Sequence, residues 1–153
     1  IKKLRESNWD AAIFAAAGLE RMDLHHEIAQ RLDWMLPAPG QGAIAIVCRD
    51  NDKDVYNVLH KLHDEETALC VNTERQYLNA LNGGCTAPIG AHVQIKDNTV
   101  VFDSVLMDPM AKTEIRIRLE NERTNEPTLG LEASYLALEK GAREILDKLP
   151  KNK

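Results

Sequence analysis

The sequence predicts two kinds of structure in one chain: incomplete α/β units in the N-terminal third, followed by a complete small α+β domain. Two continuous apolar runs, at residues 9–17 and 43–48, are typical of strands that are covered on both faces of a sheet. From about residue 54 the apolar spacing becomes helical, then alternates over three strands, and becomes helical again. A three-stranded antiparallel meander covered by helices can bury its own core, so we expect this part to fold as a domain.

The N-terminal third contains more strand than it can pair. Residues 18–22 turn out of the first predicted strand, and residues 24–32 have a weak helical pattern. The dense segment Leu36-Pro37-Ala38-Pro39-Gly40-Gln41-Gly42 then interrupts regular structure before the second predicted strand. Two such strands cannot cover both of their own faces, so their sheets need residues that this chain lacks. The chain also begins at Ile1 without an initiator methionine, and we expect it to be a fragment of a longer protein.

Two helices are predicted in the middle of the chain. The first is short and includes Val55, Leu59 and Leu62. The second runs from about Asp64 to Leu81, and its acidic first residues suit the positive end of a helix dipole. Its buried face is predicted to consist of Ala68, Val71, Leu78 and Leu81.

Three alternating strands follow, at residues 89–95, 100–107 and 115–119. Turn sequences at residues 96–99 and 108–109 separate them, which predicts an antiparallel meander. One final helix is predicted from about residue 128 to residue 149. Its buried stripe is expected to be Leu131, Tyr135, Leu138, Ala142, Ile145 and Leu149.

Composition limits the classes of function. The 153 residues carry a net charge of −5 and no basic patch interleaved with aromatic residues, which argues against a nucleic-acid partner. No run of about 18 apolar residues occurs, so we expect no membrane span and no membrane partner.

Cysteines and histidines predict neither a disulfide framework nor a metal site. The cysteines are odd in number and widely spaced, which favours a reducing, cytoplasmic compartment: Cys48, Cys70 and Cys85. The histidines that pair in the sequence have no set of thiols or acids that would complete a metal site: His25 with His26, and His60 with His63.

Cys85 has the most informative surroundings, Asn82-Gly83-Gly84-Cys85-Thr86-Ala87-Pro88-Ile89-Gly90. It lies between a helical pattern and an alternating one. The glycines allow backbone freedom, including positive φ, and leave space around the sulfur, while Pro88 prevents the helix from continuing. Such a thiol suits covalent chemistry or the attachment of a bulky group. The alternative is a buried small hydrophobic residue, the commonest role of a free cysteine.

Four segments together resemble the porphobilinogen deaminase (hydroxymethylbilane synthase) family, in order and in spacing over nearly the whole chain. The first runs from Asp10-Ala11-Ala12-Ile13 to Arg21, and the second from Leu36 to Ala43 with Cys48-Arg49. The third runs from His63 to Leu69 with Glu74-Arg75, and the fourth is Gly83-Gly84-Cys85 with Pro88-Ile89-Gly90. A single Gly-Gly-Cys would be weak evidence, whereas four segments in register are strong.

The resemblance implies a three-domain enzyme whose first two domains are α/β units like those of periplasmic binding proteins. Residues 1–39 would be the end of the second domain and the hinge, and residues 40–61 a return segment of the first domain. Residues 62–153 would form the complete C-terminal domain. The two unpaired strands would then be remnants of sheets completed by the N-terminal half.

The resemblance also implies an activity. In this family the cysteine that matches Cys85 holds a dipyrromethane cofactor through a thioether. Porphobilinogen units are added to this primer with loss of ammonia, and the linear tetrapyrrole hydroxymethylbilane is then released by hydrolysis. The catalytic aspartate of the family lies in the N-terminal half, so no catalytic residue is expected here. We expect the chain to need that half as its partner and to be inactive alone, and the full enzyme to be monomeric.

Arg21 is the next candidate, because a guanidinium group is the natural partner of the acetate and propionate groups of pyrroles. The resemblance implies that Arg21 binds substrate and cofactor, and Ala17 and Gly18 are candidates for bringing the backbone close to the cofactor. Alternatively, Arg21 is a solvated surface charge and Gly18 serves close packing.

Gln41 and Gly42 are candidates for substrate binding through amide and backbone hydrogen bonds, although the flanking glycines could serve only the hinge. They do not form a nucleotide loop, since a strand follows them rather than a helix N-terminus. Arg49 and Arg75 are weaker candidates. Glu74 or Asp64 could simply pair with Arg75, or Glu74-Arg75 could shape the cofactor loop.

Two other classes of protein remain open at this stage. A non-enzymatic ligand-binding or regulatory α+β module explains residues 62–153 but not the cysteine loop. A thiol redox protein lacks a resolving cysteine nearby in the sequence. The mass of the peptide that contains Cys85 distinguishes these three classes. The enzyme requires an adduct on Cys85, the binding module requires no modification, and the redox protein requires a reversible oxidised form.

Overall fold

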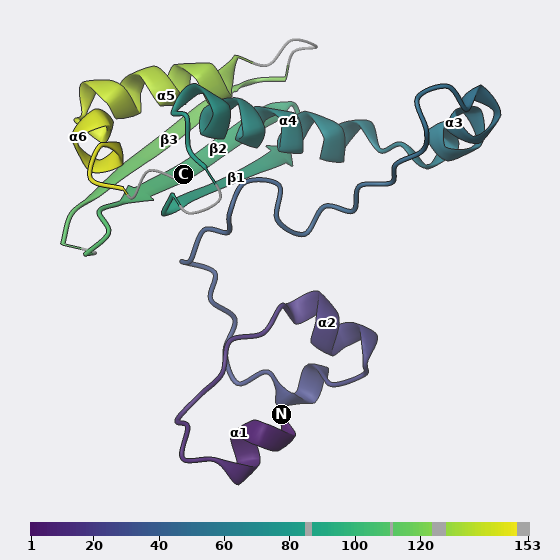
Figure 1. Cartoon of the computed structure of the whole chain (residues 1–153), viewed down its shortest axis with the longest axis vertical. Helices are drawn as coiled ribbons and strands as arrows, with labels where there is room; N and C mark the ends of the chain where they lie inside the picture. The colour runs from purple at the N-terminus through teal and green to yellow at the C-terminus, as the bar shows by residue number, and fades with distance from the viewer. Residues whose placement is uncertain (85–86, 111, 124–127, 150–153) are drawn as a thin grey trace. The chain divides into compact units, whose positions relative to one another are not determined.

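The structure is a computed structural model that describes residues 1–84, 87–110, 112–123 and 128–149 (Figure 1). Cys85 and Thr86 lie outside the described residues. The chain divides into two compact units, residues 1–35 and residues 36–153, which are described separately. None of the helices in the described ranges is long and apolar enough to cross a membrane.

The first unit contains helix α1 (Lys2–Glu6), helix α2 (Ala16–Arg21) and the 3-10 helix η1 (His25–Glu27). Arg5 of α1 binds the carboxylate of Glu27, and Arg31 binds Glu20 of α2. Of the helical pattern predicted over residues 24–32, only the single 3-10 turn η1 forms.

The strand predicted at residues 9–17 does not form in the described structure. Residues 9–15 are irregular, and Ala16 and Ala17 belong to α2. The apolar side chains of this run are exposed, with Ile13 74% accessible. The prediction was wrong for this chain because a strand needs a neighbouring backbone to pair with, and none of the described residues of this unit forms one.

The strand predicted at residues 43–48 is absent from the described structure for the same reason. Ile44 and Val47 are 81% and 87% exposed, and the segment forms no strand with any of the described residues. The short helix that follows is confirmed as α3 (Lys53–Leu59), continued by the 3-10 helix η2 (His60–Leu62). Asp52 begins α3, since its side chain accepts a hydrogen bond from the N–H of Val55.

The C-terminal domain is an antiparallel sheet in the order β1-β2-β3, covered by helices, as predicted (Figure 1). The strands are β1 (Ile89–Lys96), β2 (Thr99–Met107) and β3 (Glu114–Glu122). Helices α4 (Glu65–Ala80) and α5 (Leu129–Glu139) lie side by side on the sheet, and α6 (Ala142–Leu146) follows. The predicted strands and the long helix before them are thus confirmed.

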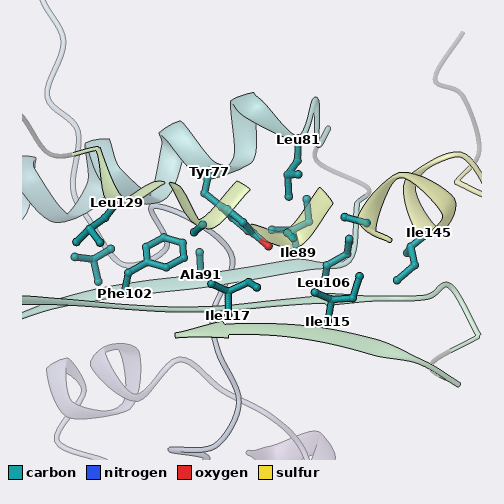
Figure 2. Packing of buried hydrophobic residues seen from close by; sticks show 14 of the residues in the cluster. Tyr77, Leu81, Ile89, Ala91, Phe102, Leu106, Ile115, Ile117, Leu129 and Ile145 are labelled. Carbon is teal, nitrogen blue, oxygen red and sulfur yellow. The ribbon is translucent and has the colours of Figure 1, made fainter. Parts of the chain in front are cut away.

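The core lies between the helices and one face of the sheet (Figure 2). In register, Phe102 of β2 lies opposite Val93 of β1 and Leu119 of β3, so these three side chains share the face under the helices. Tyr77 of α4 meets Phe102 edge to face, with ring centroids 5.3 Å apart. Both aromatic side chains are fully buried.

The buried face of α4 differs from the predicted one. Leu81, at the end of the helix, is buried as predicted, whereas Ala68, Val71 and Leu78 are only half-buried. The buried residues within the helix are Thr73, Glu74 and Tyr77. Apolar periodicity places charged residues on the solvent-exposed face of a helix, so it could not predict that Glu74 is buried.

The single final helix predicted over residues 128–149 is also corrected. It is divided into α5 and α6 at Gly141, whose φ of 94° is left-handed. Ala142 and Ile145 are buried as predicted, but Leu131 and Tyr135 are exposed. Small residues face α4 and the sheet instead, because the two helices approach too closely for large ones: Gly130, Ala133, Ser134 and Ala137.

Candidate functional site

The described part of the cysteine loop begins with a defined helix end. Helix α4 is capped by Leu81, and Asn82 adopts a left-handed φ of 51°. The N–H of Gly83 donates to the carbonyl oxygen of Leu78 at 2.9 Å, and the N–H of Asn82 donates to that of Asn79 at 3.0 Å. This pair of bonds is a Schellman motif, which turns the chain sharply away from the helix.

Gly83 has a different role from the one expected. Its φ is not positive, and the left-handed residue is Asn82. A Cβ on Gly83 would lie 2.5 Å from Cδ1 of Ile89 and 2.8 Å from Cδ1 of Leu78. Gly83 therefore serves close packing at the entrance to the loop, where a larger residue would require the ends of these two side chains to shift.

The far side of the loop is tied to the sheet. The N–H of Ala87 donates to the carbonyl oxygen of Gly84 at 3.0 Å, which joins the two residues that flank the undescribed pair. The carbonyl oxygen of Pro88 accepts from the N–H of Met107 in β2, also at 3.0 Å. The described residues on both sides of the loop, 82–84 and 87–88, are thus tied to the folded domain.

The Pro/Gly segment lies along the outer edge of β1. The carbonyl oxygen of Pro37 accepts from the N–H of Ala91 at 2.9 Å. Gly90 leaves room for this approach, since a Cβ there would lie 3.0 Å from the carbonyl oxygen of Leu36. Gly40 has a φ of 73°, so the chain turns there, and Gly42, with a φ of 88°, follows.

Glu74 is the polar group that joins this segment to the domain. Its side chain is only 7% exposed. One carboxylate oxygen accepts from the N–H of Gly40 at 2.6 Å, and the other accepts from the N–H of Val93 at 2.9 Å. Nδ1 of His92, a half-exposed side chain, lies 3.5 Å from the second oxygen.

The alternative in which Glu74 pairs with Arg75 is not the one that the described structure shows. The carboxylate of Glu74 points into the domain, while Arg75, one residue later on α4, is exposed. Sequence analysis missed the role of Glu74. The available signal was its position three residues before Tyr77, which places the two side chains on the same helix face.

Helix α2 brings three predicted site residues together. Ala17 and Gly18 are one turn before Arg21, so all three lie on neighbouring positions of the same helix surface. Arg21 is exposed, and its side chain makes no ion pair with any described residue. A Cβ on Gly18 would meet nothing within 4 Å, so close packing among the described residues does not explain this glycine.

Gln41 and Gly42 belong to the other unit. Both are exposed, and a Cβ on Gly42 would meet nothing within 4 Å. They directly follow Gly40, the residue held by Glu74. The backbone N–H of Gln41 already donates to the carbonyl oxygen of Ala38 at 3.0 Å, so the groups left to bind a ligand here are the side-chain amide of Gln41 and the backbone of Gly42.

The remaining candidates have ordinary surroundings. No group of three or more histidine, cysteine or acidic side chains in the described ranges could hold a metal ion. His60 stacks on both Tyr56 and His63, with ring centroids 5.6 Å and 5.5 Å away. Cys70 is half-buried, and burial raises the pKa of its thiol, which makes it a poor nucleophile. Cys48 is half-buried and Arg49 is exposed.

Comparison with known families gives two consecutive matches. Residues 1–57 match the family described as "Porphobilinogen deaminase, dipyromethane cofactor binding domain". Residues 68–138 match "Porphobilinogen deaminase, C-terminal domain". The first match contains α2, Gln41 and Gly42, and the second contains Glu74 and Cys85.

Curated relatives agree with these matches. A porphobilinogen deaminase of Oceanobacillus iheyensis is 39% identical over 153 residues, covering 97% of this chain and 48% of the relative. One of Staphylococcus carnosus is 40% identical over 155 residues, covering 97% of this chain and 49% of the relative. One of Macrococcus caseolyticus is 35% identical over 152 residues, with the same coverage of 97% and 49%. The chain spans about half the length of the curated relatives it matches.

Proposed function

The chain belongs to the porphobilinogen deaminase family, and we propose that it acts as part of an enzyme that condenses porphobilinogen into hydroxymethylbilane for heme biosynthesis. The observation that carries this proposal is the order of the two family matches, which together account for most of the chain. Four porphobilinogen units would be joined with loss of ammonia, and the product would be released by hydrolysis.

We further propose that Cys85 carries the dipyrromethane cofactor through a thioether. Gly84, directly before it, is exposed and adds no side chain beside the sulfur. The Schellman motif before the loop and the Pro88 contact after it hold both ends of the attachment point. When bound, the dipyrromethane supplies the primer to which pyrrole units are added.

The chemistry of the available donors fits such a group. Pyrrole units of this kind carry acetate and propionate, and Arg21 has an exposed guanidinium group that no described acid neutralises. In this proposal Arg21 binds these carboxylates in substrate and cofactor, while Ala17 and Gly18 allow a close approach to the backbone of α2. Gln41 and Gly42 donate hydrogen bonds to the substrate from the segment that Glu74 holds.

The domain limits are part of the same proposal. Residues 1–39 would complete the second α/β domain and the hinge, residues 40–61 would return to the first, and residues 62–153 would form the cofactor-attachment domain. The exposed apolar side chains of residues 13, 44 and 47 support this, because strands that enter the sheets of missing domains would bury them.

The N-terminal half of the enzyme is the proposed partner, since the catalytic aspartate of the family lies there. Alone, this chain would bind but not convert porphobilinogen. The complete enzyme would be a cytoplasmic monomer. No feature of the described structure favours a regulatory module or a thiol redox protein instead.

The test is a denaturing intact mass of the protein as isolated, with peptide mapping of any adduct. Added mass equal to two linked pyrrole units, located on Cys85, supports the proposal. An unmodified chain that stays unmodified and inactive after the N-terminal half and porphobilinogen are added contradicts it.

A further inference from the structure

Glu74 combines three properties that rarely occur together on a helix: it is charged, buried and bound only by backbone groups at its closest contacts. Burying an isolated carboxylate is costly unless hydrogen bonds replace its lost water. Here each carboxylate oxygen receives one backbone N–H, from Gly40 and from Val93. Charge-assisted bonds of this kind are among the stronger hydrogen bonds in proteins.

The two donors belong to parts of the chain that are far apart in sequence. Gly40 is 34 residues before Glu74, in the connecting segment, and Val93 is 19 residues after it, in the edge strand β1. Next to this contact, the carbonyl oxygen of Pro37 accepts from Ala91. Residues 36–40 are thus fastened to the domain at two points, and Glu74 also satisfies an N–H at the open edge of β1.

The fastened segment and the cysteine loop are both connected to α4. Gln41 and Gly42 directly follow Gly40 in the chain, and Gly40 is hydrogen-bonded to Glu74 of α4. At the other end, α4 continues from Glu74 to the cap at Leu81 and the turn that leads to Cys85. One helix therefore spans the distance between the proposed substrate-binding segment and the proposed attachment point.

We propose that Glu74 is a positioning residue for the proposed reaction: it fastens residues 36–40 to α4 and β1, so that Gln41 and Gly42 keep a fixed place relative to the cysteine loop. The segment then moves with the cysteine-loop domain as one body. This inference rests on the proposed function for Gln41 and Cys85.

Hydrogen exchange in the complete protein that contains this chain tests the fastening without any activity. In the unsubstituted protein, the amide of Gly40 should be protected to the same degree as that of Val93. Glu74→Gln keeps the size of the side chain but has only one acceptor oxygen and turns an NH2 group toward the other N–H. We expect exchange in residues 36–42 to become at least about tenfold faster, because one buried N–H loses its acceptor.

The matched control is Glu65→Gln, the same substitution on the same helix at an exposed position. It should leave exchange in residues 36–42 unchanged. An unprotected Gly40 amide in the unsubstituted protein overturns the proposal, and so does unchanged exchange in Glu74→Gln. Equal acceleration in β2 and β3 also overturns it, because Glu74 would then stabilise the whole domain rather than fasten one segment.

Kinetics separate positioning from stability. For the folded, cofactor-bearing fraction of Glu74→Gln, we expect KM for porphobilinogen to rise several-fold and kcat to change less, since the affected segment binds substrate. An unchanged KM beside accelerated exchange in residues 36–42 overturns the positioning role. Intact mass is measured in parallel: absence of the adduct on Cys85 in the unsubstituted protein would refute the proposed function, while the exchange result would still decide whether Glu74 fastens the segment.

Discussion

Gly130 of α5 lies directly against the backbone of Thr73 in α4. A Cβ on Gly130 would lie only 2.2 Å from the carbonyl oxygen of Thr73 and 2.8 Å from Cβ of Gln76. These are not the ends of flexible side chains, so they cannot move aside without moving α4. The contact sets the spacing of the two helices one residue away from Glu74, and thus supports the candidate site.

Gly130→Ala is therefore expected to destabilise the protein. Overpacking of this kind costs typically about 1–3 kcal/mol, and the rigid backbone contact favours the upper part of that range. The free energy of unfolding, measured by urea denaturation, checks this. Glu139→Ala, an exposed change at the end of the same helix, serves as the control and should alter stability little. If the two variants had the same free energy of unfolding, the contact between Gly130 and Thr73 would not limit the spacing of α4 and α5.

Cys85→Ser is expected to fold but to carry no cofactor. A serine hydroxyl is far less nucleophilic than a thiolate, so the covalent bond should not form by the same route. Intact mass should show complete loss of the adduct, while the circular dichroism spectrum should remain that of the folded protein. Cys48→Ser, the control, should keep the adduct. An adduct on Cys85→Ser would place the attachment elsewhere, and a loss of folded structure would show that Cys85 is a structural residue.

Arg21→Gln is expected to weaken substrate binding without changing stability. Loss of a charged hydrogen-bond partner should raise KM for porphobilinogen about tenfold or more. Arg21→Lys should recover only part of the affinity, because lysine keeps the charge but not the planar fork. Steady-state kinetics of the complete enzyme measure both effects. Arg31→Gln is the control, since Arg31 already binds Glu20, and an equal rise in KM there would indicate a general effect of surface charge.

Stability in acid is expected to depend on Asp64. The N–H of Thr67 donates to its carboxylate at 2.7 Å, and this hydrogen bond lowers the pKa of Asp64 below its ordinary value of 3.8. Because the folded pKa is the lower one, the contribution is complete above pH 3.8 and is lost as pH falls through the lowered value.

Two substitutions separate the cap from its charge. Asp64→Asn keeps an acceptor for Thr67 but does not titrate, so its stability should approach that of the unsubstituted protein as the solution is acidified. Asp64→Ala loses the acceptor and should be less stable at neutral pH. Urea midpoints at pH 7 and at about pH 3 measure this difference. A constant difference between the unsubstituted protein and Asp64→Asn at both values would contradict the lowered pKa.

Much of the C-terminal domain could be predicted because its partners are close in sequence. Strands β1, β2 and β3 pair with their immediate neighbours, so alternation and turn residues specify both the strands and their pairing. The start of α4 at Asp64 was predicted from its acidic first residues, and the structure adds the cap, a contact between residues three apart.

The failed predictions concern contacts with distant or missing residues. The apolar runs at 9–17 and 43–48 have strand composition, but composition cannot supply the backbone partners that make a strand. The final helix ends early because Gly141 takes a left-handed φ, which a helical stripe of apolar residues does not reveal.

By itself, the sequence determined the α+β meander, the helix that precedes the cysteine and the place of Cys85 between two elements, because local periodicity and turn chemistry act within a few residues. Only the tertiary structure decided which side of α4 is buried, why Gly130 must lack a side chain, and that Glu74 holds Gly40. These depend on how closely separate elements approach one another in space. A carboxylate can be buried only where distant backbone groups replace its water, and no local pattern records that arrangement.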